Sequence, residues 1–141
     1  MVKVEEYDLP DDLYYHEEHC WVKIEDGKVR IGFDDFTQKL AGKMKRISLP
    51  FEGDELQQDQ PIGTIESGKW VGKIIAPVSG VVVQVNEKME ETPWLINDDP
   101  YGQGWIAVVE PSKLQEELPK LHYKEKAVEW TKREIKEHVK K

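Results

Sequence analysis

The middle of the chain contains the stretch Ile65-Glu66-Ser67-Gly68-Lys69-Trp70-Val71, where two β-prone runs, residues 62–67 and 70–75, meet at Gly68-Lys69. Glycine tolerates the positive φ that tight hairpin loops often need, so the pair predicts a turn between antiparallel strands. Such a turn places Lys69 beyond the end of the sheet, with its amine on a four-carbon stem. Taken alone, a lysine of this kind is most simply a solvated side chain. The surrounding sequence gives it a more specific meaning.

The composition is that of a folded chain large enough for a hydrophobic core. The chain has 141 residues, of which 38% are hydrophobic, and it includes five Trp and five Tyr. No apolar run approaches the roughly 18 residues of a membrane span. A single cysteine, Cys20, excludes an internal disulfide, and the acidic first dozen residues do not resemble a signal peptide. We therefore expect a cytoplasmic protein that does not bind membranes.

The net charge of −8 is unevenly distributed along the chain. Residues 111–141 contain nine Lys/Arg and six Glu, whereas residues 1–110 contain 11 basic and 22 acidic side chains. An acidic body repels phosphate backbones, so we expect no nucleic-acid partner. It suits a protein that docks on basic clefts of other proteins.

Short β-prone runs between turn residues predict a mainly β fold. Residues 20–24 and 29–33 are expected to pair around an Asp26-Gly27 turn, and Asp34 is expected to cap a helix over residues 35–41. From residue 53 to 80, Gly and Pro recur at short intervals, which favours a small barrel or sandwich of antiparallel strands over a βαβ fold. Residues 1–12 are expected to form a polar lead-in.

Towards the C-terminus the pattern becomes helical. Ser112 and Gln115 form a candidate capping box, and a second helix is expected over residues 124–140. Its apolar face would carry Val128, Thr131, Ile135 and Val139. We therefore expect a domain over residues 1–110 and a helical extension over residues 111–141. The extension either packs on its own domain or serves as a basic docking arm for a partner.

Several phrases occur together and in order in this sequence. They are His16-Glu17-Glu18-His19-Cys20-Trp21-Val22, Ile31-Gly32-Phe33-Asp34-Asp35-Phe36, Leu49-Pro50 followed by Gly53-Asp54, Ile65-Glu66-Ser67-Gly68-Lys69, Ala76-Pro77-Val78-Ser79-Gly80, Val85-Asn86 and Leu95-Ile96-Asn97-Asp98-Asp99-Pro100-Tyr101-Gly102-Gln103-Gly104-Trp105. Over about residues 8–110 the sequence resembles the H-protein family of the glycine cleavage system, which is related to lipoyl and biotinyl carrier domains. The phrase from Asp99 to Trp105 is the most specific of these.

The resemblance implies a barrel-sandwich hybrid, a flattened barrel of antiparallel strands with short helices and a C-terminal helix. Lys69 would lie on an exposed hairpin and carry lipoate through an amide bond. The protein would then be a carrier and not an enzyme. A long flexible tether lets one dithiolane reach several active sites at high effective concentration.

The resemblance also implies the partners of such a carrier. Lipoyl-Lys69 would shuttle an aminomethyl group between glycine decarboxylase, aminomethyltransferase and dihydrolipoyl dehydrogenase. A lipoate-attaching enzyme would first recognise the hairpin, and Glu66, Ser67, Gly68 and Trp70 are expected to form that recognition surface. We expect the carrier to be a monomer.

Positions near the arm depart from the family pattern. Cys20 stands where the family has a glutamate, Lys73 stands where it commonly has an aspartate, and Trp70 replaces a small residue beside the lysine. In the family picture the two carboxylates lie near the cationic amine of the cargo, so their replacement removes attraction and adds repulsion.

These departures leave other functions open. One is a lipoate-binding carrier for another pathway, such as sulfur oxidation with a heterodisulfide-reductase-like complex or a relay of lipoyl groups to other proteins. Another is an unmodified scaffold module that binds through residues 111–141.

The remaining groups of polar and reactive residues are most simply structural or solvated. His16, His19 and Cys20 have no second ligand pair at zinc spacing, so we expect no metal. Cys20 is expected to pack in a strand and not to act as a redox partner of lipoyl thiols. The sequence contains no nucleophile motif, P-loop or dinucleotide fingerprint. The acidic pairs are expected to be solvated: Glu90-Glu91, Asp98-Asp99 and Glu116-Glu117.

Overall fold

The hairpin around Asp26-Gly27 forms the centre of the larger sheet. In this computed structural model, which describes residues 2–139, β4 (Cys20–Glu25) pairs with β5 (Lys28–Phe33). Both turn residues have positive φ, 49° for Asp26 and 79° for Gly27, as this kind of tight turn requires. The other strands of the sheet are β3 (Tyr14–Tyr15), β7 (Glu55–Leu56), β10 (Gly80–Val85), β11 (Ala107–Pro111) and β12 (His122–Tyr123). The order is β12-β3-β4-β5-β11-β10-β7, and every pairing is antiparallel.

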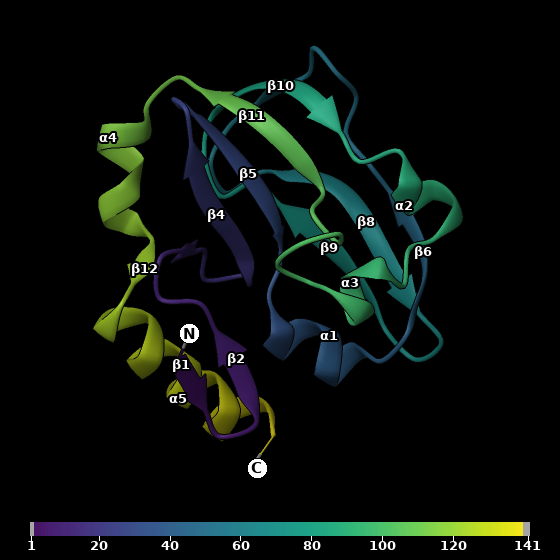
Figure 1. Ribbon diagram of the computed structural model, residues 1–141, viewed down its shortest axis with the longest axis vertical. Coiled ribbons are helices and arrows are strands. Elements are labelled where there is room, and N and C mark those ends of the chain that lie inside the picture. The colour runs from purple at the N-terminus through teal and green to yellow at the C-terminus, as the bar shows by residue number, and fades with distance from the viewer. Residues whose placement is uncertain (1, 140–141) are drawn as a thin grey trace.

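A second antiparallel sheet packs on the first and carries the Lys69 hairpin. Its strands are β6 (Met44–Ser48), β8 (Pro61–Ser67) and β9 (Val71–Ile75), in the order β6-β8-β9. Both sheets contribute buried side chains to one core, among them Ile31 and Val109 from the larger sheet and Met44, Ile65 and Ile74 from the smaller. The predicted mainly β, flattened sandwich of short antiparallel strands is therefore confirmed (Figure 1).

Short helices lie in the connections between strands. α1 (Asp35–Ala41) begins where Asp34 Oδ1 accepts a hydrogen bond of 2.9 Å from the Thr37 N–H, and it ends at Gly42, whose φ is 84°. The predicted Asp34 cap is therefore present, and the helix ends at residue 41 as predicted, with Gly42 as its C-cap. α2 (Lys88–Glu91) and α3 (Leu95–Asp98) lie in the connection between β10 and β11.

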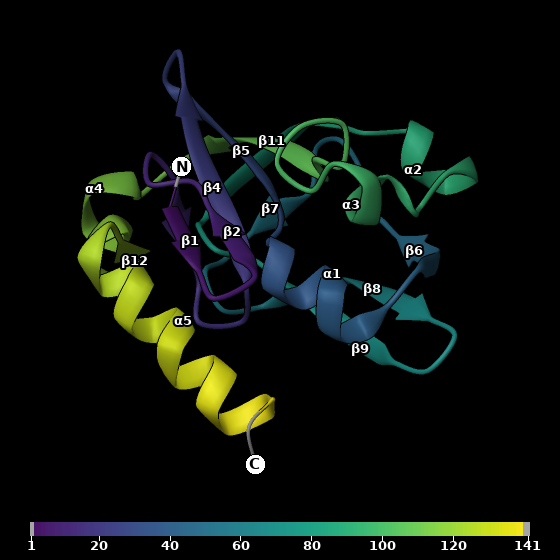
Figure 2. The same ribbon diagram turned by 60° about the horizontal axis from the view of Figure 1, so that its bottom comes forward.

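The expectation of a polar lead-in over residues 1–12 was wrong. β1 (Val2–Val4) and β2 (Tyr7–Leu9) form a hairpin that lies beside the C-terminal helix α5 (Glu125–His138) in both views (Figures 1 and 2). Val4, Tyr7 and Leu9 are buried in a second core between this hairpin, α1 and α5. The acidic residues of this segment made its apolar positions hard to recognise in the sequence, and those positions are buried because α1 and α5 pack on the hairpin.

The C-terminal helices differ in detail from their prediction. The Ser112 capping box was wrong, because α4 (Leu114–Glu117) has Lys113 as its N-cap, with no side-chain hydrogen bond, and leads into the 3-10 helix η1 (Leu118–Lys120). α5 packs on its own protein, but through a rotated face: its buried residues are Ala127, Trp130, Thr131 and Ile135. Val139 of the expected face is exposed, and residue 140, the expected end, lies outside the described residues.

Glu117 is buried and not solvated as expected. Its Oε1 accepts a hydrogen bond of 2.7 Å from the Ser79 N–H, and its Oε2 accepts one of 2.5 Å from the Ser79 hydroxyl. A charged acceptor with two donors tolerates burial because its lone pairs remain hydrogen-bonded. Ser79 belongs to the loop before β10, so Glu117 fastens the C-terminal segment to the larger sheet.

The division into a domain over residues 1–110 and an extension over residues 111–141 stays a prediction. Within the described chain, the second segment is closely integrated with the first. β12 pairs with β3, the Tyr14 and Tyr123 rings stack with centroids 4.1 Å apart, and Leu121 is buried in the main core.

We predict that Glu117→Ala lowers the free energy of unfolding by about 2 kcal/mol, because the Ser79 donors are left buried without an acceptor. Urea unfolding followed by tryptophan fluorescence measures this change. Glu116→Ala, an exposed neighbour on the same short helix, is the matched control and should change stability by less than about 0.5 kcal/mol. Equal stability of the two variants would contradict the role given to Glu117.

Candidate functional site

The hairpin expected around Gly68-Lys69 is present. β8 and β9 pair up to Glu66 and Val71, and the Ser67 N–H donates a hydrogen bond of 2.8 Å to the Trp70 carbonyl across the turn. The positive φ expected for Gly68 was wrong, because φ is positive only at Gly27, Gly42, Gly53 and Gly80 among the glycines described. Gly68 and Lys69 form the exposed tip of the second sheet.

Lys69 presents its amine to solvent. Within residues 2–139, Lys69 Nζ has no hydrogen bond and no ion pair. The stem of Lys69 passes close to the end of α1, since a Cβ built on Gly42 would lie 3.5 Å from Lys69 Cε. The end of the stem therefore lies near Gly42, while the residue as a whole remains exposed.

The residues expected to form the recognition surface surround this tip in different ways. Glu66 is half-buried and lies between Arg46 of β6 and Val71 of β9 in the sheet register. Ser67 is buried, and its hydroxyl accepts a hydrogen bond of 3.4 Å from the Lys69 N–H. Their role in recognition stays a prediction.

Trp70 is accommodated by a glycine two residues further along the strand. A Cβ built on Gly72 would lie 2.3 Å from Trp70 Cη2, which is far inside van der Waals contact. The indole therefore lies over Gly72 and packs against the main core. A larger residue at position 72 would displace Trp70, so the bulky side chain beside the lysine and the glycine depend on each other.

The segment under Lys69 is held by Asn97 of α3. Asn97 Oδ1 accepts a hydrogen bond of 2.8 Å from the Met44 N–H, and its Nδ2 donates one of 2.8 Å to the Gly42 carbonyl. Sequence reasoning used Asn97 only as part of a family phrase and missed this role. The available signal in the sequence was the short polar side chain of Asn97, which stands between the apolar pair Leu95-Ile96 and the two aspartates Asp98-Asp99.

The most specific family phrase also has structural roles. Tyr101 donates a hydrogen bond of 2.7 Å to the Asp8 carbonyl and accepts one of 2.9 Å from the Asp35 N–H. The Trp21 indole N–H donates one of 3.0 Å to the Pro100 carbonyl. The phrase thus connects the N-terminal hairpin, α1 and β4, and it positions the site without lining it.

A groove of about 680 Å³ lies next to the hairpin, between β9, α1 and α5. Apolar side chains form part of its wall, among them Phe33, Phe36, Leu40 and Trp70. Its charged and polar lining includes Glu18, His19, Lys73, Glu134 and His138. The groove begins at the strand that follows Lys69, so a chain attached to Lys69 has a mixed apolar and charged surface beside it.

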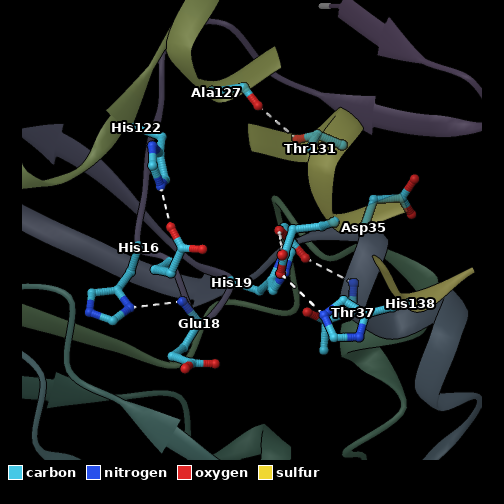
Figure 3. Close-up of polar contacts among 12 residues, drawn as sticks. His16, Glu18, His19, Asp35, Thr37, His122, Ala127, Thr131 and His138 are labelled. Carbon is cyan, nitrogen blue, oxygen red and sulfur yellow. Dashed lines mark hydrogen bonds and ion pairs between the residues drawn. The ribbon is translucent and has the colours of Figure 1, made fainter. Parts of the chain in front are cut away.

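His19 is held between two carboxylates at the wall of this groove. Its Nδ1 lies 2.7 Å from Asp34 Oδ2, and its Nε2 lies 2.7 Å from Glu134 Oε1 of α5 (Figure 3). Phe36 stacks with the His19 ring at a centroid distance of 4.8 Å, and Trp130 lies against it at 4.5 Å with its ring tilted by 32°. The φ of His19 is 73°, a conformation that non-glycine residues rarely adopt.

These contacts make His19 a cation at neutral pH. Burial alone would lower its pKa, but attraction and hydrogen bonds from Asp34 and Glu134 outweigh burial and raise the pKa to about 9. The hydrogen bond with His19 in turn lowers the pKa of Glu134. One buried imidazolium therefore joins α1, through its capping residue, to α5.

The structure separates the two positions where the sequence departs from the family. Lys73 lines the groove and is exposed, whereas Cys20 is fully buried in the main core and does not line it. Burial raises the pKa of the Cys20 thiol, which therefore stays protonated. The expectation that Cys20 packs in a strand is thus confirmed, and Glu18 is the carboxylate of this segment that lines the groove.

His16, the other histidine of the first family phrase, also has hydrogen-bond partners. His16 Nδ1 accepts a hydrogen bond of 2.9 Å from the Glu18 N–H, and its Nε2 lies 2.6 Å from Asp59 Oδ1. Within residues 2–139, no group of three or more His, Cys, Asp or Glu side chains is arranged to hold a metal ion. None of the helices in this part of the chain is long and apolar enough to cross a membrane.

We predict that His19 makes stability fall at alkaline pH. Its pKa is about 9 in the folded protein and about 6.5 in the unfolded chain, so its contribution is complete below about pH 6.5 and is lost as the pH rises through about 9. Urea unfolding should show that the stability difference between wild type and His19→Asn shrinks by about 3 kcal/mol from about pH 7 to pH 10.

The partner Glu134 gives an independent check by NMR titration of His19. Glu134→Gln should lower the pKa of His19, whereas Glu137→Gln, an exposed position on the same helix, should leave it unchanged. A His19 pKa near the unperturbed value in wild type would contradict the ion pairs described here.

Comparison with known proteins places this fold and site in one family. The family model for "Glycine cleavage H-protein" matches residues 13–134. The match therefore extends beyond residue 110, the predicted end of the resemblance. The chain is 42% identical over 133 residues to a "Probable glycine cleavage system H protein" of Pyrococcus abyssi, covering 94% of this chain and 98% of the relative. It is 47% identical over 120 residues to a "Glycine cleavage system H protein" of Halalkalibacterium halodurans, covering 83% and 94%.

A solved structure agrees with these relatives. The crystal structure of a glycine cleavage system H protein from Mycobacterium marinum matches with a TM-score of 0.79 and 31% identity, covering 89% of this chain and 98% of that one. Both kinds of comparison cover most of the chain, and the residues matched by the family model include the hairpin that presents Lys69. The chain belongs to the glycine cleavage H-protein family.

Proposed function

We propose that this protein is the lipoyl carrier of a glycine cleavage system, with lipoate attached to Lys69. The observation that carries the proposal is the Lys69 amine, which is exposed and unpartnered among the described residues at the tip of a hairpin fixed to a rigid sandwich. A carrier needs such an amine, because the attaching enzyme has to reach it and the finished arm has to leave the surface. Family membership supports the same assignment.

The residues around Lys69 fit a covalent lipoyl group. Acylation of Lys69 Nζ displaces no hydrogen bond or ion pair within residues 2–139. In the attachment step the Lys69 nitrogen forms an amide bond with an activated lipoate carboxyl, the activating group leaves, and the amine releases a proton. When attached, lipoate supplies a dithiolane that carries the aminomethyl group and then electrons between the partner enzymes.

In this proposal the protein acts as a carrier and substrate, not as a catalyst. Its partners are glycine decarboxylase, aminomethyltransferase, dihydrolipoyl dehydrogenase and the lipoate-attaching enzyme. Lys69 contributes reach, and the β8-β9 hairpin contributes a fixed direction. We expect it to work as a cytoplasmic monomer.

In this proposal the lipoyl arm rests in the groove beside the hairpin. Its apolar wall from Phe36, Leu40 and Trp70 suits the hydrocarbon part of the arm, because covering it removes apolar surface from water. Glu18 provides a carboxylate towards a cationic cargo, and Lys73 opposes it. Since Cys20 lies in the core, Lys73 is the one of the two family-departing positions that lines the groove and can act on the charge of a cargo.

The alternative of a carrier for sulfur oxidation or lipoyl relay shares the same Lys69 chemistry. The relatives described above carry the name glycine cleavage system H protein, which favours the glycine pathway. Lys73 is the one position in the groove that favours the alternative, because it suits a neutral or anionic cargo. The unmodified scaffold predicts that Lys69 remains a free amine.

We predict that Lys69→Arg abolishes lipoylation, because arginine keeps the charge but cannot form the amide. Intact-mass measurement after incubation with lipoate and a lipoate-attaching enzyme should show one added lipoyl group on wild type and none on the variant. Lys113→Arg, an exposed lysine far along the chain, should be modified like wild type. Modification of Lys69→Arg, or no modification of wild type, would contradict the assignment.

A second measurement distinguishes the pathway. The lipoylated wild type should support exchange of the glycine carboxyl group with bicarbonate by glycine decarboxylase. A fully lipoylated protein that supports no exchange would overturn the glycine cleavage function and leave a carrier for another pathway.

We predict that Lys73→Asp raises this exchange activity up to about five-fold, because the repulsion of a cationic cargo that it removes and the attraction that it adds are together worth about 1 kcal/mol for an exposed side chain. The gain should shrink at high salt, since Lys73 is exposed. Lys120→Asp, an exposed lysine on η1, is the control with the same charge change. No gain, or an equal gain in the control, would contradict an effect of the groove charge.

A further inference from the structure

The surface around Lys69 has the opposite charge to the rest of the protein. The outer face of the β6-β8-β9 sheet and its hairpin tip form what we call the arm face, made of Lys45, Arg46, Glu66, Lys69, Val71 and Lys73. Four of these six side chains are cationic and one is acidic, in a chain with a net charge of −8. Such a local reversal of charge is unexpected for a surface that only needs to be solvated.

The strand register places these residues on one surface. Arg46 pairs with Glu66, and Glu66 pairs with Val71, so the three form a row across the sheet. Lys73 lies two residues after Val71 and pairs with Thr64, so it continues the same face. Lys45 adjoins the tip, since a Cβ built on Gly68 would lie 3.5 Å from Lys45 Nζ.

The cations of the arm face are not neutralised by contacts within the protein. None of the four takes part in an ion pair within residues 2–139. The apolar member, Val71, is 71% exposed. An apolar residue surrounded by unpaired charges is the usual composition of a docking surface, with an apolar centre and a polar rim.

We infer that the arm face is the docking surface for the lipoate-attaching enzyme, and that this enzyme meets it with an acidic surface. The inference rests on the proposed function and names the chemistry of one partner. An enzyme that acylates Lys69 has to bring Nζ into its own active site, so it contacts the residues within a few ångströms of the tip. Partners that act on the far end of a long arm make no such demand on this face.

The charge complementarity favours an acidic protein over nucleic acid. A phosphate backbone that approached the arm face would also meet the acidic body of the chain, with 22 acidic and 11 basic side chains in residues 1–110. A protein surface can match the small patch alone. Complementary charges at a rim mainly raise the association rate, so the effect should appear in kcat/KM and should depend on salt.

The test measures the initial rate of Lys69 lipoylation by intact mass, with the unmodified full chain, lipoate and a lipoate-attaching enzyme from the same organism. The double variant Lys45→Glu/Arg46→Glu should lower kcat/KM at least about ten-fold at low salt. The matched control Lys113→Glu/Lys120→Glu makes the same change in net charge near α4, at the opposite side of the molecule from β6 (Figures 1 and 2). It should stay within about two-fold of wild type.

Salt dependence and folding complete the experiment. Raising the salt from about 0.01 M to about 0.3 M should slow wild type and bring the two rates closer together. Thermal unfolding should show both double variants folded, because all four positions are exposed.

The outcomes separate the two claims. If wild type is lipoylated and the Lys45/Arg46 variant is equally fast, or the control is equally slow, the docking surface is overturned and the carrier stands. If wild type is not lipoylated at Lys69, the carrier function itself fails. Binding of a nucleic-acid duplex through Lys45 and Arg46, with lipoylation unchanged, would also overturn the docking surface.

Discussion

The alternation of side chains along β8 and β9 is the constraint on which the site depends. Ile65 and Ile74 point into the core shared by the two sheets and are almost completely buried. Because successive residues of a strand point to opposite faces, burying these two fixes Glu66 and Lys73 on the outer face. A slip of one residue would place charged side chains in the core, so the register that positions Lys69 beyond the sheet is strongly specified.

The C-terminal segment completes the site from the other side. α5 contributes Glu134 and His138 to the groove, and it is fixed there by the His19 imidazolium, which both Asp34 and Glu134 contact. Asp34 also caps α1 through its other oxygen. Two elements that line the groove are therefore joined through one charged group, and a buried charge of this kind is stable only while both carboxylates remain in place.

Sequence reasoning reached the local features and missed those that depend on distant contacts. The Asp26-Gly27 turn, the Asp34 cap and the Lys69 hairpin were predictable because each is encoded within a few neighbouring residues. The N-terminal hairpin and the buried Glu117 were not, because the hairpin is covered by α1 and α5 and Glu117 is bound by Ser79, all distant in the sequence. The family motif identified the Lys69 hairpin. Strand periodicity alone could not show that Cys20 lies in the core whereas Lys73 lines the groove.

In the lipoylated protein, recognition by a partner and chemical reaction take place at opposite ends of the Lys69 side chain. The near end of the arm is fixed, because Trp70 packs over Gly72 and Asn97 holds the backbone beneath Lys69. A partner that docks there loses little conformational entropy, since the surface is already ordered. The far end gains its usefulness from the opposite property, because a mobile group on a fixed base samples nearby active sites at high effective concentration.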